Sequence, residues 1–159
     1  MAQLSMHSPV GDLTVTEEDG KIISLDWGWI PAEWQTETPL LVSAIEQLNQ
    51  YFDGDIGDFD LPLDPPGTDF QKRVWDQMLK IPAGTTKSYG DLAKALTTAA
   101  QPVGTACGAN PIPIIIPCHR VLAAGGQMGG YSGLGGLDTK KSLLKLEKAL
   151  PPEQQTLDL

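Results

Sequence analysis

The chain has 159 residues, of which 41% are hydrophobic and 19% are charged, as in typical globular proteins. No apolar run approaches the roughly 18 residues of a membrane-spanning helix, and the first residues show no basic stretch followed by an apolar core, so we expect neither a transmembrane segment nor a secretory signal. The net charge of −9 by itself argues against a protein that binds nucleic acid.

The charge is distributed unevenly along the chain. Residues 1–66 hold 13 acidic residues and one basic residue, Lys21, whereas residues 67–159 hold 7 acidic and 10 basic residues. We therefore predict two domains, 1–66 and 67–159, with different partners. The simplest interpretation is that the acidic half is a solvated face, which would repel phosphate and leave the basic half to meet it.

The first domain is predicted to be rich in strands. Alternating apolar residues at 10–15 and 22–27 indicate two strands joined by a turn at 18–20. Apolar residues at helical spacing predict a helix over 40–52. The stretch 53–67 is rich in proline and aspartate, so we expect a linker or an extended crossing segment.

The second domain begins with three predicted helices. The first covers 70–80, where apolar residues recur at helical spacing. The stretch Ser88-Tyr89-Gly90-Asp91 has the form of a capping box and predicts a short helix that ends at Leu96. A third helix is predicted over 101–107, because Pro102 is tolerated only in a first turn. Two short helices at this spacing favour a helix-turn-helix.

An apolar run follows, and we predict that 112–116 is a buried strand. The glycine-rich segment 125–136 is expected to be a wing or a pocket-lining loop, and Asp138 is expected to cap a last helix over 139–150. The predicted fold is therefore of the mixed α/β (α+β) class, with a small strand-rich N-terminal domain and a C-terminal winged helix-turn-helix domain.

A thiol and an imidazole stand side by side at the end of the apolar run. Cys118 becomes a good nucleophile only when its proton is removed, and His119 is a candidate base. Glu147 lies four residues after Leu143 and three after Leu144, which places a carboxylate at the edge of an apolar stripe. A buried carboxylate needs a partner, so Cys118, His119 and Glu147 form a candidate nucleophile, base and orienter. Alternatively, Glu147 is a surface residue that pairs with a lysine of the same helix: Lys140, Lys141 or Lys148.

Two tyrosines are further candidates. Tyr89 is either a packing residue or a phenol that donates a proton to a leaving group. Tyr131 and Ser132 lie in the glycine-rich loop and could give backbone and hydroxyl donors to a small polar ligand, although such loops are commonly hairpins.

The cysteines and histidines do not form a metal site. The chain has two of each, at spacings that match no zinc pattern, so we expect no metal. Without an export signal, Cys107 and Cys118 are expected to be reduced thiols in the cytoplasm, and Cys107 is expected to be a packing residue.

Several motifs in one order resemble the O6-alkylguanine-DNA alkyltransferase family. They are Phe70-Gln71-Lys72-Arg73-Val74-Trp75, Ile81-Pro82-Ala83-Gly84-Thr85-Thr86, Ser88-Tyr89-Gly90, Asn110-Pro111, Pro117-Cys118-His119-Arg120-Val121, Gly130-Tyr131-Ser132-Gly133 and Leu143-Leu144-Lys145-Leu146-Glu147. The resemblance is strong over 68–149 and one of layout over 1–67. It implies a protein that binds double-stranded DNA carrying O6-alkylguanine, flips the damaged base and moves the alkyl group irreversibly onto its own cysteine.

The resemblance also implies residue roles. Cys118 is the acceptor, His119 the base and Glu147 its orienter, while Tyr89 donates a proton to the departing guanine. The backbone donor of Ser132 holds the O6 atom.

Other positions are expected to shape the substrate site. Tyr131 lies in the same loop, and backbone carbonyls near Cys118 and Val121 accept from the exocyclic amine. Asn110 braces the helix-turn-helix against the active-site strand. Each molecule acts once as a methylated-DNA–protein-cysteine S-methyltransferase, and no cofactor is needed.

The chain departs from the family pattern at two places. The recognition helix of the family begins Ala-Arg-Ala-Val-Gly, and its arginine fills the gap left by the flipped base, whereas this chain has Gln101 at that position. The loop after Tyr131 carries two extra residues. We therefore expect weak, mostly non-specific DNA binding with a shallow salt dependence, supported by four cations: Lys72, Arg73, Lys87 and Lys94.

Two other functions compete with alkyl transfer. The first is binding of alkylated lesions without catalysis, although family members of that kind lack the cysteine. The second is a cysteine hydrolase built on Cys118, His119 and Glu147, although the sequence shows no oxyanion hole. We expect a monomer that does not associate with a membrane.

Overall fold

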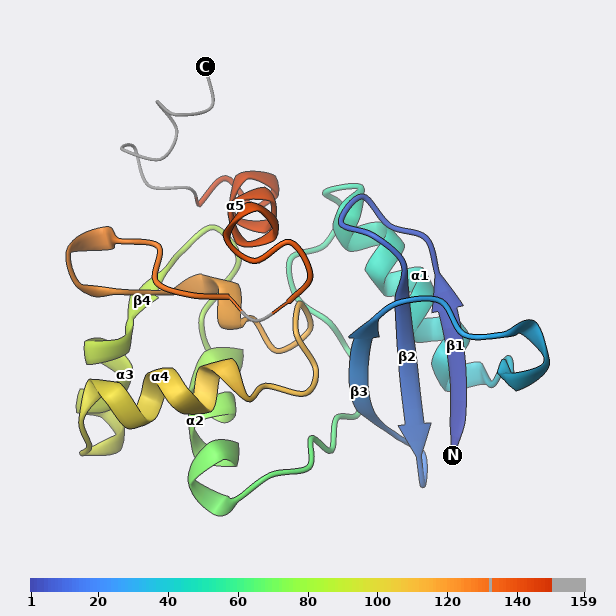
Figure 1. Ribbon diagram of the computed structural model, residues 1–159, viewed down its shortest axis with the longest axis horizontal. Coiled ribbons are helices and arrows are strands. Elements are labelled where there is room, and N and C mark those ends of the chain that lie inside the picture. The colour runs from blue at the N-terminus through green and yellow to red at the C-terminus, as the bar shows by residue number, and fades with distance from the viewer. Residues whose placement is uncertain (132, 150–159) are drawn as a thin grey trace.

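The computed structural model describes residues 1–131 and 133–149 as one antiparallel sheet with its helix at one end and a group of helices at the other (Figure 1). The fold is of the predicted mixed α/β class. Buried residues of the sheet and of the helices belong to one large hydrophobic cluster, and a smaller cluster is formed by Leu122, Met128 and Leu144. The two halves are therefore packed together rather than only tethered.

The N-terminal half is a three-stranded meander with a helix on one face. Strands β1 (Ala2–Met6), β2 (Leu13–Glu18) and β3 (Lys21–Trp27) pair antiparallel in chain order. Helix α1 (Pro39–Phe52) begins after Thr38, whose side chain accepts from the Leu41 amide, and packs its buried face against β2. A short 3-10 helix, η1 (Ala32–Trp34), precedes it. The two predicted strands, their turn and the helix are confirmed, whereas β1 was not predicted.

The segment after α1 is more than a linker. The Ile22 amide donates to the Pro62 carbonyl, and the Asp64 amide donates to the Ile22 carbonyl, both over 2.8 Å. The chain thus crosses alongside the free edge of β3 at Leu63 before it enters the second half. These bonds satisfy part of an edge strand that would otherwise be unpaired.

The C-terminal half opens with three short helices as predicted. Helices α2 (Asp69–Leu79) and α3 (Tyr89–Leu96) both start with capping boxes, and α4 (Ala100–Gly108) carries Pro102 in its first turn. Thr97, with a left-handed backbone, makes the turn between α3 and α4. Strands β4 (Lys87–Ser88) and β5 (Val121–Leu122) pair in parallel.

The prediction of a strand over 112–116 was wrong. The Ile116 amide donates to the Ile112 carbonyl over 2.9 Å, and Ile114 has a φ of 74°, so the segment is a buried turn. Prolines at 111, 113 and 117 lack the amide donors that a strand needs. The isoleucines at 112, 114 and 116 are fully buried and belong to the hydrophobic cluster that both halves share.

The last helix also differs from the prediction. Helix α5 (Leu137–Leu146) starts after Gly136, and Asp138 lies within its first turn rather than at its cap. It ends at Leu146 with Glu147 as its C-cap, because Lys148 takes a left-handed conformation with a φ of 60° and the Ala149 amide donates back to the Leu144 carbonyl. The predicted end at Leu150 lies outside the described residues.

Candidate active site

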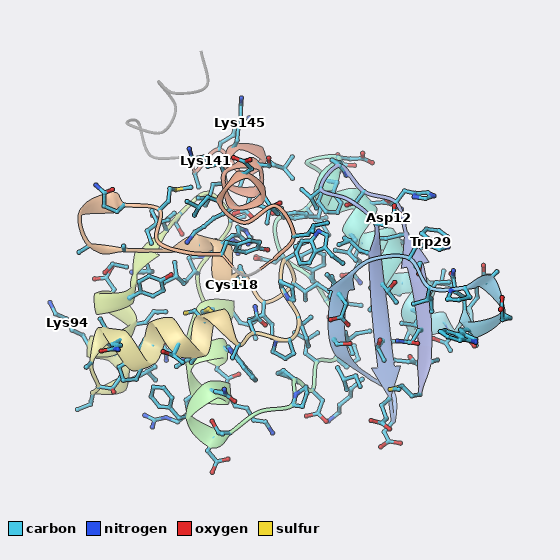
Figure 2. The ribbon with its side chains drawn as sticks, viewed as in Figure 1. Asp12, Trp29, Lys94, Cys118, Lys141 and Lys145 are labelled. Atoms are coloured by element: carbon cyan, nitrogen blue, oxygen red, sulfur yellow. The ribbon has the colours of Figure 1, made fainter. Side chains whose placement is uncertain are left out.

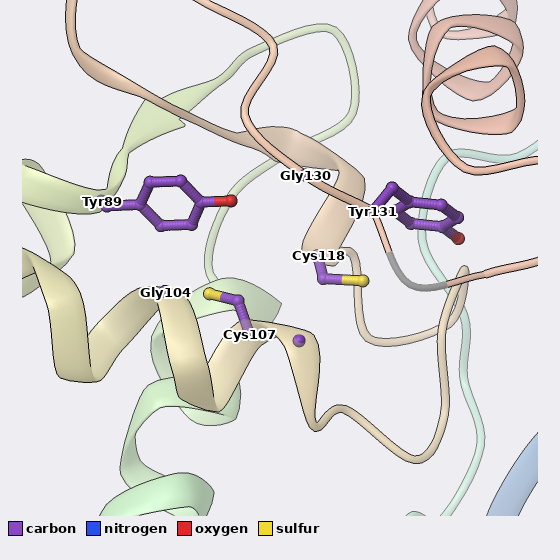
Figure 3. A pocket seen from close by; sticks show the side chains of 7 residues that line it. Tyr89, Gly104, Cys107, Cys118, Gly130 and Tyr131 are labelled. Carbon is purple, nitrogen blue, oxygen red and sulfur yellow. The ribbon is translucent and has the colours of Figure 1, made fainter.

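Cys118 lines a cavity of about 390 Å³ between α4 and the glycine-rich loop (Figure 3). The remaining lining residues are Tyr89, Gly104, Cys107, Gly108, Gly130 and Tyr131. Figure 3 shows Tyr89 and Tyr131 on opposite sides of Cys118. A planar group in this cavity would therefore meet the sulfur between two aromatic side chains.

A short 3-10 helix, η2 (Cys118–Arg120), holds the cysteine in place. The Cys118 amide donates to the Ile116 carbonyl over 2.8 Å, which ties the helix to the buried isoleucine turn. The Val121 amide donates to the Cys118 carbonyl and leads the chain into β5. Cys118 therefore follows a buried turn instead of the predicted strand. Packing of the turn's isoleucines in the core holds this segment in place.

The thiol of Cys118 is a poor acid in the resting protein. Burial raises its pKa, while the side-chain amide of Asn110 and the charge of Lys140 oppose that rise. The side chain is nearly enclosed, with 8% of the residue exposed. Reaction at sulfur therefore needs a group that takes its proton.

His119, the predicted base, follows Cys118 in the chain. Its Nε2 lies 2.6 Å from Glu147 Oε2, and both side chains are buried, which confirms the predicted pair. Its Nδ1 is buried and has no hydrogen-bond partner among the described residues. Since Nε2 donates to the carboxylate, Nδ1 carries the free lone pair and can accept a proton. Burial lowers the pKa of His119, and Glu147 opposes this shift.

Glu147 is held by more partners than the sequence indicated. Arg120 donates from Nε to Oε1 over 2.8 Å, and Tyr51 of α1 donates to Oε2 over 2.5 Å. Burial alone would raise the pKa of Glu147, but the hydrogen bonds from His119, Arg120 and Tyr51 hold it at about 2. In the described part of the chain the carboxylate pairs with His119 and Arg120, so the surface pairing with lysines is wrong.

Lys140 links three backbone segments near the cavity through hydrogen bonds. Its Nζ donates to three carbonyls, those of Val121 at 2.8 Å, Met128 at 2.5 Å and Gly130 at 3.1 Å. Burial lowers its pKa to about 8, and the two cysteines oppose this shift. The Val121 carbonyl, expected to accept from a guanine amine, thus already accepts from Lys140, and its second lone pair is the one left for a substrate.

Tyr89 lines the cavity, and Asn110 is hydrogen-bonded to the isoleucine turn. Tyr89 is the first residue of α3, and burial raises the pKa of its phenol, so it keeps its proton. Gly129, with a φ of 66°, passes so close that a side chain there would crowd the Tyr89 hydroxyl. Asn110 donates to the Ile116 carbonyl over 2.8 Å and accepts from the Ile112 amide over 2.9 Å, so it holds the isoleucine turn that stands in place of the predicted strand, and its bracing of the helices stays a prediction.

The glycine-rich loop brings Tyr131 to the cavity. Its ring packs edge-on against the ring of Trp27 of β3, with 6.3 Å between the ring centroids. Its buried hydroxyl has no hydrogen-bond partner among the described residues. Ser132 lies outside the described residues, so its predicted role stays a prediction.

The predicted DNA-binding residues lie on the helical half of the molecule. Gln101 is exposed in the first turn of α4. It lines a surface hollow together with Phe70 and Gln71 of α2. Lys94 projects from the end of α3, far from Asp12 and Trp29 of the sheet half (Figure 2). The other three predicted cations, Lys72, Arg73 and Lys87, are also exposed.

Three residues of this site were not assigned a role from the sequence. Lys140 lies three and four residues before Leu143 and Leu144, so the helical spacing could have placed it on the buried face. Arg120 follows His119, but nothing local shows that its guanidinium turns toward Glu147. Tyr51 belongs to the other half of the chain, and no sequence signal links it to this carboxylate.

Neither a metal cluster nor a membrane helix is found in the described residues. No three histidine, cysteine or acidic side chains gather as metal ligands within 1–131 and 133–149. None of the helices in those ranges is long and apolar enough to cross a bilayer.

Comparison with known proteins accounts for nearly the whole chain. Residues 2–65 match the 6-O-methylguanine DNA methyltransferase ribonuclease-like domain, and residues 69–149 match the DNA binding domain of the same enzyme. The chain belongs to the O6-methylguanine-DNA methyltransferase family. Membership agrees with the cysteine, histidine and glutamate at the centre of the site.

Individual relatives are similar over most of their length. The methylated-DNA–protein-cysteine methyltransferase of Mycobacterium tuberculosis is 42% identical over 96% of each chain, and that of Methanosarcina acetivorans is 41% identical over 89% of this chain and 94% of the relative. The structure of Mycobacterium tuberculosis OGT in complex with DNA is 41% identical, covers 100% of both chains and has a TM-score of 0.84. An O6-methylguanine DNA methyltransferase from Methanococcus jannaschii has a TM-score of 0.66 at 28% identity, with coverage of 91% of this chain and 93% of the other.

Proposed function

We propose that this protein repairs DNA by moving an alkyl group from the O6 atom of guanine onto Cys118, once per molecule. The observation that carries the proposal is a buried thiol that lines a cavity and is followed in the chain by a histidine hydrogen-bonded to a buried carboxylate. Family membership gives the substrate class, since relatives of this length are named for methylated DNA.

The reaction is a displacement at carbon. His119 takes the proton of Cys118 through its free Nδ1, directly or through one water, and the sulfur attacks the alkyl carbon. The bond from sulfur to carbon forms as the bond from carbon to O6 breaks, and Tyr89 gives a proton to the departing guanine. Because a thioether does not hydrolyse, the protein is not regenerated, and no cofactor is required.

Glu147 supports the base in this scheme. Its carboxylate orients the imidazole through the 2.6 Å bond to Nε2 and stabilises the imidazolium that forms. Asn110 and Lys140 favour the thiolate, because both lower the pKa of Cys118 against the effect of burial.

The helical half is proposed to bind the DNA. Helices α3 and α4 with the turn at Thr97 form the proposed helix-turn-helix, the loop after β5 forms its wing, and α4 presents Gln101 to the gap left by a flipped base. This assigns 67–159 as the DNA-binding and active-site domain and 1–66 as the acidic N-terminal domain. Ser132 and Tyr131 would hold the base within the cavity.

We place the protein in the cytoplasm as a monomer. Both cysteines are free, and the reaction consumes a thiol, so a reducing compartment suits it.

The test is intact mass after incubation with a short duplex that contains O6-methylguanine. A gain of one methyl group per molecule is expected for the unaltered chain and for Cys107→Ala, and none for Cys118→Ala. Binding of the lesion without a mass change would instead indicate a lesion-binding protein. Repeated turnover of an ester substrate would indicate a hydrolase.

A further inference from the structure

One residue of the N-terminal half, Tyr51, is hydrogen-bonded to the carboxylate of the His119–Glu147 pair. Tyr51 lies in the last turn of α1, is 1% exposed, and donates its hydroxyl proton to Glu147 Oε2 over 2.5 Å. The same oxygen accepts from His119 Nε2 at 2.6 Å and from Arg120 Nη2 at 3.1 Å. Three donors thus share one carboxylate oxygen.

We propose that Tyr51 is a positioning residue that restrains the attraction of Glu147 for the His119 proton and so sets the pH at which Cys118 becomes reactive. The proposal rests on the proposed roles of Cys118 and His119. Each donor to Oε2 withdraws electron density and occupies part of the oxygen's lone-pair space. A strong hydrogen bond from Tyr51 therefore weakens the bond from His119 to that oxygen.

Packing alone does not require a hydroxyl at this position. The ring of Tyr51 contacts those of Phe52 and Phe59, each with centroids 5.4 Å away, and a phenylalanine would make the same contacts. The hydroxyl adds one bond, directed at a charged oxygen in a buried site, where charge-assisted bonds are strongest. Burial and the negative charge of Glu147 raise the pKa of Tyr51 far above its ordinary value, so the phenol is a donor at every working pH.

The other charges around the pair cannot take over this bond. Arg120 already donates to the Ile81 and Gly57 carbonyls as well as to Glu147, and its Nη1 lies 3.7 Å from Asp58. Lys140 acts on His119 through its charge, with its own donors directed at three carbonyls. Asp55 and Lys148 line the adjacent hollow at the surface. We expect all of these groups to stay in place when only the hydroxyl of Tyr51 is removed, because the hydrogen bonds of Arg120 and Lys140 to backbone carbonyls do not involve it.

The direction of the effect follows from the shared oxygen. Without the phenol, Oε2 accepts more strongly from His119, which favours the imidazolium and, with it, the thiolate of Cys118. The Tyr51→Phe variant should therefore react at lower pH than the unaltered protein. Replacement of Tyr51 by 3,5-difluorotyrosine, a stronger donor of the same shape, should move the reactive range to higher pH.

The experiment measures the rate at which iodoacetamide alkylates Cys118 as a function of pH, with the site confirmed by peptide mass. Iodoacetamide reports the thiolate and needs no guanine, so the outcome is separate from that of the O6-methylguanine test. We expect the midpoint to fall by about half a pH unit in Tyr51→Phe. An unchanged or higher midpoint in a folded Tyr51→Phe variant would overturn the proposal.

A second measurement reads His119 directly. The chain has two histidines, so in a His7→Ala background the one remaining imidazole signal in a ¹⁵N NMR spectrum belongs to His119. Its titration should move to higher pH in Tyr51→Phe and to lower pH with difluorotyrosine. Identical titrations in all three proteins would leave Tyr51 a packing residue.

Ser5→Ala is the matched control. Ser5 is buried in the same half and shares a 2.8 Å hydrogen bond with Thr14. Its loss should lower stability to a similar degree as the loss of the Tyr51 hydroxyl and leave both titrations unchanged. If Ser5→Ala moved them equally, the effect would be one of stability, and the proposal would fail.

Discussion

Replacement of Glu147 by glutamine tests the electrostatic account of the site. The change keeps the shape of the side chain but removes the charge that pairs with His119 and Arg120. Hydrogen bonds hold the pKa of Glu147 at about 2, below its ordinary value of 4.5, despite burial. A difference of that size corresponds to about 3 kcal/mol of folding free energy.

The sign of the pH dependence is fixed by the lowered pKa. A carboxyl whose pKa falls on folding contributes its full stabilisation above the unfolded value of 4.5 and loses it as the pH falls toward about 2. The Glu147→Gln variant should therefore be less stable by about 3 kcal/mol at pH 7. The difference from the unaltered protein should shrink steadily between pH 4.5 and 2, since a protonated carboxyl resembles an amide.

Urea denaturation followed by circular dichroism at several pH values measures this difference. Glu46→Gln, an equal change at an exposed position of α1, is the control and should alter stability by less than about 0.5 kcal/mol. A difference between Glu147→Gln and the unaltered protein that stays constant from pH 7 to pH 2 would refute the reasoning, because the loss would then not arise from the charge.

Three further predictions concern DNA binding and the cavity wall. Gln101→Arg should tighten binding to duplex DNA in a fluorescence titration, and unchanged or weaker binding would show that Gln101 does not fill the gap of a flipped base. Four exposed cations, Lys72, Arg73, Lys87 and Lys94, predict a log–log salt slope of about −3 to −4, and a slope near −10 would contradict this. Lys140→Met removes the donor shared by three carbonyls and should lower the free energy of unfolding by about 2 kcal/mol while it slows iodoacetamide alkylation of Cys118; a normal rate would separate Lys140 from the thiol.

The sequence by itself determined the local elements whose signals lie within a few residues. The capping box at Ser88 and Asp91 sets where α3 begins, and Pro102 limits where α4 can start. The candidate chemistry was equally local, since a cysteine and a histidine are adjacent and Glu147 sits beside the apolar residues of the last helix. The order of the motifs was sufficient to indicate the family.

Only the tertiary structure decided how the parts of the site are held. An apolar run between prolines is compatible with a strand or a turn, and 112–116 is a turn whose isoleucines are buried in the cluster that both halves share. Tyr51 meets Glu147 across 96 positions of the chain. Local patterns report which face of a helix is buried, but the partner of a buried polar group depends on how distant elements pack, and that is determined when the whole core assembles.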